Sequence, residues 1–546
     1  MKRRSFSKIL CTFLAGTLTL SVGMIGVGMI GVGAAQIDDS FVSAETASPV
    51  TGDGLPRAYS SRDLGFVTSV KSQYGQSCWA YASMATLESM LLRLGYDVAD
   101  MSTDHLNLWA TTRSDGTGWQ RDIGSDGYPN IALGYLSSWQ GGVLQSDAGD
   151  VSLNGSYTGD TIPLDLARYG VTSVEYLTKN RPDRIKQCIM DYGGVYSSFG
   201  INYAYYSGDR LSYYLPENYT GGYSGHSIEV VGWDDDYPRE NFPQMPENNG
   251  AWLIKNSHGN YNSLGGYLWI SYEDVYLFGS KFKPSYAITG AVPLDGGQKL
   301  IQNEIYGATY EFQYPEAPVL TYLNRFTFDE AFNAIDKVIF KSDAVGASYS
   351  IYFVPDGADS TPDADQSHWT RLYDGTVSYA GYLCADIEDY DLPDTHGSIA
   401  VTVDATYTEV YSSIGVCEWL QNSAGYVFLN NSKRGDSYLI QNGKMQDLMD
   451  WYKEHEDDEL GGTFVIKAVT VKHIKPTLLG DANLDGTVDI NDVTQIQRHL
   501  AEFHTLTDTA AANADYNQDC EITIEDATQI QLVLAEFSTA VAAVRA

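Results

Sequence analysis

The chain has 546 residues and a formal charge of −36, and 43% of its residues are hydrophobic. This apolar content excludes a disordered polymer, and the negative charge argues against binding to nucleic acid or to anionic membranes. A chain of this length is expected to fold into several domains.

The first 35 residues have the pattern of a secretory signal peptide. Basic residues within the first eight positions precede an apolar run from Ile9 to Val32, and small residues at 33–35 suit cleavage. The run is long enough to span a bilayer, so an uncleaved anchor is the alternative. We expect cleavage, a secreted extracellular protein and no membrane contact of the mature form, with residues 36–55 as a linker.

Cys78 stands at the predicted N-terminus of a helix. The stretch Gln73-Tyr-Gly-Gln-Ser-Cys-Trp79 passes through a turn of small residues, and a helical run then continues to Leu92. Because the positive end of a helix dipole favours a thiolate, we expect a lowered pKa for this thiol. A thiolate that attacks a carbonyl also needs an imidazole for proton transfer and a hydrogen-bond donor for the oxyanion.

Two residues downstream supply the remaining groups. His226 opens a predicted strand, and Asn256 follows another apolar strand. The histidine comes about 150 residues after the cysteine, a spacing found in papain-like enzymes. With the order Gln73, Cys78, His226 and Asn256, residues 56–290 resemble a papain-family cysteine peptidase, which has an α+β fold.

The resemblance implies a role for each of these four residues. Gln73 would hold the oxyanion, Cys78 would be the nucleophile, and His226 would act as base and then as acid. Asn256 would orient the imidazole. The resemblance also implies a protein or peptide substrate and no cofactor for catalysis.

Two residues depart from the family pattern. Tyr74 follows the glutamine in place of a glycine, and the step from Gln73 to Cys78 is one residue shorter. His258 replaces the tryptophan that shields the histidine–asparagine hydrogen bond, so we expect less shielding and competition for that bond. A second interpretation therefore stays open, in which a weak or inactive peptidase fold binds polysaccharide or protein. A third is a cell-wall hydrolase, although such enzymes usually orient the histidine with a second histidine or an acid.

Residues 291–475 contain short β-branched and aromatic runs separated by turn residues, a pattern that predicts an all-β sandwich. These runs are 335–341, 348–354, 398–403, 425–429 and 463–471. A β-domain in this position resembles the lectin-like domain of some bacterial papain-like peptidases, which makes carbohydrate a candidate ligand. Tyrosine is also ordinary strand material, so the abundant tyrosines do not by themselves indicate a sugar site.

The C-terminal region carries a tandem repeat of two acidic loops. Each loop presents oxygen ligands at positions 1, 3, 5, 7, 9 and 12, as a calcium-binding EF-hand-like loop does. Position 6 is Gly486 in the first loop and Cys520 in the second. We therefore expect two Ca²⁺ ions, one in each loop. The candidate ligands are Asp481, Asn483, Asp485, Thr487, Asp489 and Asp492 in the first loop, and Asp515, Asn517, Asp519, Glu521, Thr523 and Asp526 in the second.

Each loop leads into a predicted helix, and apolar residues recur at matching offsets in the two helices. These residues are Val493, Ile496, Leu500 and Phe503, and then Ala527, Ile530, Leu534 and Phe537. Because no full helix precedes the first loop, residues 476–546 resemble a type I dockerin, a small α-helical calcium-binding domain. The resemblance implies a cohesin module of a scaffold protein as the partner. The predicted protein is a multidomain peptidase on a cell-surface-associated, cellulosome-like complex that degrades polysaccharide.

Overall fold

The computed structural model describes residues 54–535, apart from 99, 150, 154–156, 283, 314–316, 358–359, 419, 422–426, 430–431, 442, 456–460 and 520. The predicted signal peptide and nearly all of the predicted linker therefore lie outside the described residues. The chain divides into two compact units, one covering Ile37–Lys472 and the other including His473–Ala546. Within the described ranges, no helix has both the length and the apolarity needed to cross a bilayer.

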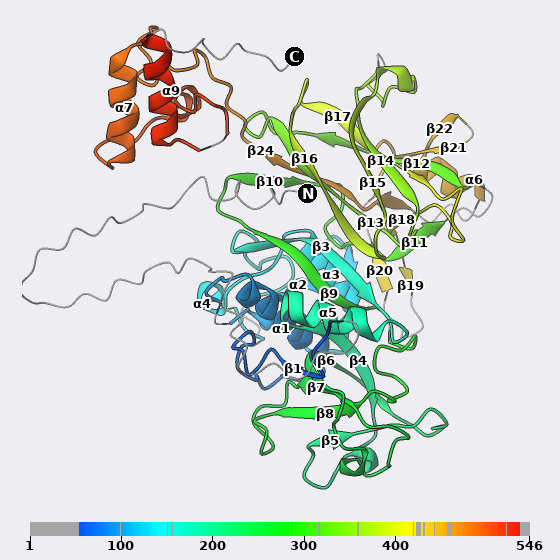
Figure 1. The fold of residues 1–546 in the computed structure, drawn as a ribbon. Coiled ribbons are helices and arrows are strands. Elements are labelled where there is room, and N and C mark those ends of the chain that lie inside the picture. The colour runs from blue at the N-terminus through cyan, green and yellow to red at the C-terminus, as the bar shows by residue number, and fades with distance from the viewer. Residues whose placement is uncertain are drawn as a thin grey trace, which may run out of the picture. The chain divides into compact units, whose positions relative to one another are not determined.

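The N-terminal part of the larger unit combines helices with a mainly antiparallel sheet, as an α+β fold does (Figure 1). Its helices are α1 (Cys78–Arg93), α2 (Thr103–Trp109), α3 (Pro129–Ser137), α4 (Gln145–Ala148) and α5 (Pro182–Tyr192). Its strands are β1 (Ala58–Ser60), β2 (Gly118–Trp119), β3 (Tyr169–Leu177), β4 (Val195–Ile201), β5 (Ser212–Tyr213), β6 (Ser224–Asp234), β7 (Ala251–Lys255), β8 (Tyr267–Ser271) and β9 (Ser285–Pro293).

Two elements of this part are buried on nearly every side. Helix α1 buries Trp79, Met84 and Leu87 completely, because apolar or small residues occupy almost all of its positions. Strand β6 is buried from His226 to Trp233 and lies between β4 and β7. A nearly continuous apolar run is typical of a strand that is covered on both faces. These two elements carry the predicted nucleophile and the predicted base.

The second part of the larger unit is the predicted β-sandwich. Its strands are β10 (Gln298–Ile301), β11 (Tyr310–Gln313), β12 (Val319–Thr327), β13 (Ala334–Ser342), β14 (Ser348–Val354), β15 (Thr370–Thr376), β16 (Gly381–Asp391), β17 (His396–Asp404), β18 (Ser413–Glu418), β19 (Leu420–Gln421), β20 (Val427–Leu429), β21 (Ser437–Gln441), β22 (Lys444–Asp447), β23 (Gly462–Phe464) and β24 (Ile466–Val471). One helix, α6 (Leu448–His455), was not predicted.

The sandwich core lies between two sheets. Strands β15-β14-β17-β12-β21-β22 form one sheet, and β10-β24-β13-β16 face it. Alternate residues point inward, such as Tyr349, Ile351 and Phe353 of β14 against Val338 and Phe340 of β13. This period of two matches the alternation from which the strands were predicted.

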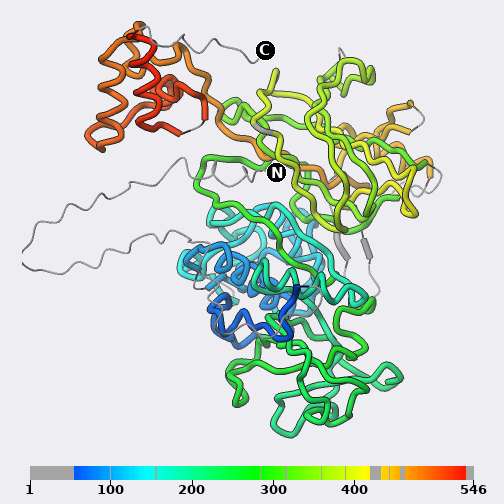
Figure 2. The backbone as a smooth tube through the Cα atoms, in the orientation of Figure 1, coloured from blue at the N-terminus to red at the C-terminus, as the bar shows by residue number. Residues whose placement is uncertain are grey.

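Strand β16 joins the two parts of the larger unit, since it pairs with β13 on one side and with β3 on the other. The pairing sets Gly381 opposite Glu175 and Tyr382 opposite Val174. Gly381 has φ +135°, and a Cβ there would lie 2.1 Å from the Val174 carbonyl oxygen, so glycine is needed at this contact. The sheet is therefore continuous between the two parts, and Figure 2 traces the chain through it. The predicted boundary at residues 290–291 falls inside β9 and remains a prediction.

The C-terminal unit contains α7 (Ile490–Leu500), α8 (Asp508–Ala514) and α9 (Ile524–Leu534), and Figure 1 shows α7 and α9 side by side. Val493 and Ile496 are buried against Ala527 and Ile530, as predicted. Farther along the predicted face, Leu500 and Phe503 of the first repeat and Leu534 of the second are exposed, Phe503 by 79%. Helix α7 ends at Leu500 and α9 ends at Leu534, so these side chains lie outside the small core. Phe537 lies outside the described residues.

Candidate active site

His226 and Asn256 form a direct hydrogen bond at one edge of the central sheet. The distance between His226 Nε2 and Asn256 Oδ1 is 2.8 Å, and both side chains are buried. Because an amide oxygen only accepts, Nε2 must carry the proton, which leaves Nδ1 free to accept another. Asn256 is itself held, since its Nδ2 donates to the Tyr261 hydroxyl at 3.2 Å and its Oδ1 accepts from the Ser257 amide.

His258 covers one face of the His226 imidazole. The two rings stack with centroids 4.8 Å apart and planes inclined by 28°. The predicted competition for Asn256 is not seen, because Asn256 bonds to His226, Ser257 and Tyr261 instead. His258 therefore covers one face of the imidazole, and the expectation that it shields the His226–Asn256 bond less than a tryptophan would remains a prediction.

Gln73 is anchored to the loop that follows Asn256. Its backbone N–H donates to the Ser257 carbonyl at 2.7 Å, and its Oε1 accepts from the Ser257 hydroxyl at 2.7 Å. Its Nε2 donates to the Gly75 carbonyl at 3.0 Å and keeps one further hydrogen for another acceptor. The shortened turn thus leaves this amide close to Asn256.

Cys78 begins helix α1 and is buried. Burial raises the pKa of its thiol, hydrogen bonds from the backbone and hydroxyl of Ser227 lower it, and the charge of Asp126 raises it. The prediction of a lowered pKa is therefore wrong for this structure, because the desolvation of a buried thiolate outweighs the helix N-terminus. Ser227 directly follows His226, so its hydrogen bonds bring the thiol to the start of β6.

The pKa of His226 is lowered to about 4. Burial is the main cause, the hydrogen bond to Asn256 opposes it, and the like charge of His258 lowers the pKa further. At neutral pH this structure therefore favours a neutral thiol at Cys78 and a neutral imidazole at His226.

A buried cluster of hydroxyl groups supports Ser227. The Ser227 Oγ accepts from the Tyr196 hydroxyl at 2.7 Å and lies 3.0 Å from Ser198 Oγ. Tyr196 stacks on Tyr286, with centroids 4.7 Å apart, and Tyr286 donates to Ser83 on helix α1. The cluster thus connects the strand that carries His226 to the helix that carries Cys78.

The first predicted calcium loop is held by hydrogen bonds from backbone amides to side-chain oxygens. The amide of Asp485 donates to Asp481 Oδ1 at 3.1 Å and to Asn483 Oδ1 at 2.8 Å. Asp492 accepts from the backbone amides of Asn483 and Asp489. Gly486, at position 6, has φ +85°, a left-handed conformation that glycine adopts without strain.

The second predicted loop repeats this pattern at its end. Asp526 is buried and accepts from the amides of Tyr516 and Thr523 at 2.8 Å each. Among the described residues, no three His, Cys, Asp or Glu side chains already converge on one metal position. Cys520 lies outside the described residues.

Solved structures of one bacterial protein match most of the chain. The clostridial cysteine protease Cwp84 after propeptide cleavage is 32% identical, with a TM-score of 0.67, and the match covers 76% of this chain and 99% of that one. The chain belongs to the papain family of cysteine peptidases. The structure of the cysteine protease and lectin-like domains of Cwp84, a surface layer associated protein of Clostridium difficile, is also 32% identical with a TM-score of 0.67, covering 78% of this peptidase and 90% of that chain.

Family models match three consecutive regions of the peptidase. They are described as papain family cysteine protease at residues 55–288, lectin like domain at 300–470 and dockerin type I domain at 479–534. Cathepsin 7 of Rattus norvegicus is 24% identical over 219 residues, which cover 39% of this chain. The peptidase spans about 60% of the length of that relative.

The sequence did not reveal a buried ion-pair network beneath the site. Lys255, the residue before Asn256, donates to Thr68 Oγ1 at 2.9 Å and lies 3.4 Å from Glu229. Lys71 forms an ion pair with Glu88 of helix α1. Thr68 and Lys71 lie on the segment that leads to Gln73, so the network ties this segment to the end of β7. No linear motif joins these five residues, since each contact crosses between elements.

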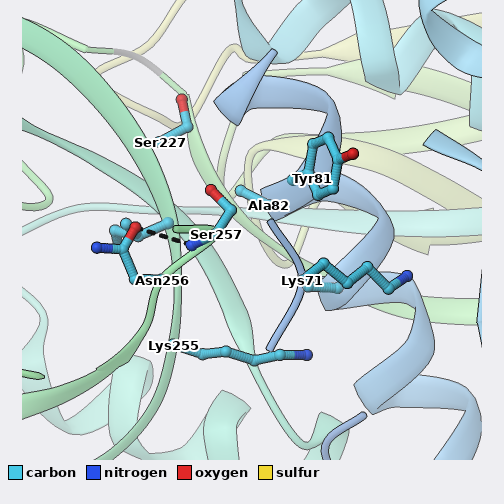
Figure 3. A pocket seen from close by; sticks show the side chains of 9 residues that line it. Lys71, Tyr81, Ala82, Ser227, Lys255, Asn256 and Ser257 are labelled. Atoms are coloured by element: carbon cyan, nitrogen blue, oxygen red, sulfur yellow. Dashed lines mark hydrogen bonds between the residues drawn. The ribbon is translucent and has the colours of Figure 1, made fainter. Parts of the chain in front are cut away.

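A small cavity separates helix α1 from the ends of β6 and β7. Figure 3 shows Tyr81 and Ala82 on the helix across from Ser227, Asn256 and Ser257. The cavity leaves about 10 Å³ for water-sized molecules, which is about the space of a single water. Helix α1 and the residues around Asn256 therefore pack closely against each other beside the site.

Proposed function

We propose that this chain hydrolyses peptide bonds with Cys78 as nucleophile, His226 as proton carrier and Asn256 as the residue that fixes the imidazole tautomer. The observation that carries the proposal is the 2.8 Å bond from His226 Nε2 to Asn256 Oδ1, because it leaves Nδ1 unprotonated. A neutral imidazole in this tautomer can take the proton of a neutral thiol. The raised pKa of Cys78 and the lowered pKa of His226 favour these forms near neutral pH.

The reaction then proceeds in two halves. His226 Nδ1 takes the thiol proton as the Cys78 sulfur bonds to the scissile carbonyl carbon, and the oxyanion accepts hydrogen bonds from the Cys78 amide and from Gln73 Nε2. The carbon–nitrogen bond breaks as His226 returns the proton to the leaving amine. In the second half, His226 takes a proton from water, the hydroxide attacks the thioester, and the thiol is restored.

Covalent labelling tests the nucleophile. The mature chain is incubated with an epoxysuccinyl thiol inhibitor, and peptide mapping by mass spectrometry should find one adduct, on Cys78. Cys188 is the matched control, because it is also buried in the peptidase part and burial raises its pKa to about 12. Cys78→Ala should lose both the adduct and peptide hydrolysis, whereas Cys188→Ala should keep both. Hydrolysis near the unmodified level in Cys78→Ala would identify another nucleophile.

A weak or inactive peptidase that binds polysaccharide or protein is the second candidate. The raised pKa of Cys78 and the lowered pKa of His226 favour it, because both shifts work against a thiolate–imidazolium pair. The labelling experiment separates the two candidates. An intact fold that neither forms the adduct nor cleaves a mixed peptide library supports the binding function, with carbohydrate as a candidate ligand of residues 291–475.

For the C-terminal unit we propose calcium-dependent docking onto a cohesin module. The donor chemistry fits Ca²⁺, since the loops present hard carboxylate, amide and hydroxyl oxygens. Asp481 and Asp492 are buried, and within the described part of the chain no cationic side chain forms an ion pair with either. Bound Ca²⁺ would supply that missing positive charge. Asp481, Asn483, Asp485, Thr487, Asp489 and Asp492 would hold one ion, and Asp515, Asn517, Asp519, Glu521, Thr523 and Asp526 the other.

Chelation tests this docking. Removal of calcium should release the chain from an immobilised cohesin, whereas peptide hydrolysis should continue, because the two proposed sites lie in different compact units. Loss of hydrolysis as well would show that calcium also supports the peptidase. A dockerin and a surface-layer-associated relative both support an extracellular location on a multi-enzyme complex.

A further inference from the structure

Five neighbouring strands begin or end close to His226, at the same end of the sheet. The sheet order is β4-β6-β7-β8-β5. Ile201 at the end of β4 pairs with Ser224 at the start of β6, and Lys255 at the end of β7 pairs with Tyr267 at the start of β8. Strand β5 runs parallel to β8 and begins at Ser212. The connection 202–211, from β4 to β5, therefore passes this edge, next to the loop 256–266.

Aromatic side chains continue from His226 along this edge. His258 stacks on His226, and Tyr261 meets His258 edge to face with centroids 6.1 Å apart. On the connection, Tyr203 and Tyr206 stack with centroids 6.1 Å apart. Tyr203 is 71% exposed, which is unusual for so large a ring. These tyrosines offer a contact surface beside the proposed site.

Arg210 stands at the end of the same connection in a strained backbone conformation. Its φ is +58°, a left-handed value that non-glycine residues rarely adopt. Two contacts fix it there, since its N–H donates to the Ser207 carbonyl at 2.8 Å and its carbonyl accepts from Asn262 Nδ2 at 3.2 Å. Strain held in this way is concentrated at functional sites.

The guanidinium of Arg210 has no acidic partner among the described residues. The neighbouring Asp209 uses its carboxylate within the turn, accepting from the Ser207 hydroxyl at 2.6 Å and the Leu211 amide at 3.1 Å. Arg210 also influences the site through its charge. Burial is the main cause of the lowered pKa of His258, and the positive charge of Arg210 lowers this pKa further. Arg210 thus presents a positive charge on an exposed loop of a chain whose net charge is −36.

The chemistry of His226 determines which part of a substrate lies here. His226 returns a proton to the leaving amine, so the segment after the scissile bond must pass beside this imidazole. His258 stacks on this imidazole, Tyr261 contacts His258, and the 202–211 connection passes the same end of the sheet. They are therefore placed to meet the leaving segment of the substrate.

We propose, on the basis of the proposed peptidase function, that Arg210 binds a carboxylate on the leaving segment of the substrate, with Tyr203 as an adjacent aromatic contact. The substrate class is a peptide whose carboxylate lies a few residues after the cleaved bond. Either an acidic side chain or the C-terminal carboxylate can supply this charge. A positive site beside the cleft also offsets the repulsion between an acidic enzyme and an acidic peptide.

The test compares three internally quenched peptides with the same acyl side. The first has glutamate on the leaving side and a C-terminal amide, the second has glutamine and an amide, and the third has glutamine and a free C-terminal carboxylate. A fourth substrate, a peptidyl dye amide, has no leaving peptide at all. Each is assayed with the unmodified chain, Arg210→Gln, Arg210→Glu and the control Arg239→Gln. Arg239 lies beyond the opposite end of β6, so its replacement removes the same charge elsewhere in the same part of the chain.

Arg210→Gln should lower kcat/KM for a carboxylate-bearing peptide by about two- to fivefold, the usual range for an exposed ion pair. Loss on the first peptide identifies a side-chain carboxylate as the ligand, and loss on the third identifies the C-terminus. Arg210→Glu should reverse the preference, and Arg239→Gln should change nothing. Equal effects on all substrates, including the dye amide, or no effect of Arg210→Gln, would overturn the proposal while leaving the peptidase function intact. Failure of the unmodified chain on every substrate would instead contradict the peptidase function and this inference with it.

Discussion

The stacked rings of His226 and His258, 4.8 Å apart, couple the charge of one imidazole to that of the other. Burial is the first cause of the low pKa of His226, about 4, and the charge of His258 adds to it. A neutral His226 is the form that accepts the thiol proton. The stack therefore extends the proposed activity toward lower pH.

Replacement of His258 by glutamine should move the acid limb of the pH profile of kcat/KM to higher pH. Without the like charge, the pKa of His226 rises toward its ordinary value, so His226 becomes protonated and inactive as a base at a higher pH. The profile is measured with a fluorogenic peptide. His396→Gln, in the β-sandwich, is the control and should leave the limb in place. An unmoved limb in His258→Gln would show that the charge of His258 does not reach His226.

Ser227 and Asp126 should have opposite effects on the Cys78 thiol. After burial, hydrogen bonds from Ser227 lower the pKa of this thiol, and the charge of Asp126 raises it. At a fixed pH near neutrality, Ser227→Ala should slow alkylation of Cys78 by iodoacetamide, and Asp126→Asn should accelerate it. The rates are followed by mass spectrometry. Asp122→Asn is the control, as it removes a charge from the same loop. Changes of equal sign in Ser227→Ala and Asp126→Asn would contradict this account of the thiol.

Gln73→Ala should lower kcat by about 10- to 1,000-fold with little change in KM, the usual cost of one oxyanion donor. Ser257→Ala should give a smaller loss of the same kind, because the Ser257 hydroxyl only anchors the Gln73 amide at 2.7 Å. Steady-state kinetics on one peptide measure kcat and KM for both variants. An effect confined to KM would place Gln73 in substrate binding rather than at the oxyanion.

The candidate site was predictable where its residues lie in recognisable local motifs. The order of Gln73, Cys78, His226 and Asn256 along the chain was enough to predict that His226 and Asn256 lie next to each other. The support for these residues was not predictable, because Ser227, Tyr196 and the Lys255 network meet only through contacts between strands and helix. The pKa of Cys78 was mispredicted for the same reason. A helix N-terminus can be predicted from the sequence, but the burial that opposes it depends on tertiary packing.

The fold was likewise predictable from local patterns but not from contacts between distant segments. Period-two alternation predicted strands such as Ser348–Val354 and the sandwich they build. It did not predict that β16 would pair with β3, because this pairing depends on the close approach of Gly381 to Val174. In the C-terminal unit the pattern predicted an apolar face on each helix, and Val493 and Ile496 of this face are buried. It did not predict that Leu500 and Phe503 would be exposed, because the extent of the core depends on tertiary packing.

The two proposed calcium loops differ at position 6, where an EF-hand-like turn favours a left-handed residue. In the first loop Gly486 has φ +85°, and a Cβ added there would meet no atom within 4 Å. A side chain at this position is therefore opposed by backbone strain alone, about 1 kcal/mol, or roughly fivefold in a binding constant. The second loop has Cys520 at this position. At position 9, the first loop also has the charged Asp489 where the second has the neutral Thr523.

Both differences predict that the second loop binds Ca²⁺ more weakly and loses it first. Calorimetric titration of the full chain, with Cys78→Ala to prevent hydrolysis, should resolve a tighter and a weaker site. Cys520→Gly should strengthen the weaker site by about fivefold, and Gly486→Cys should weaken the tighter site by a similar factor. The two substitutions form a matched pair, since each exchanges the same two residues. Equal affinities in the unmodified loops, or a Cys520→Gly chain with an unchanged weaker site, would show that something other than strain at position 6 sets the order of binding.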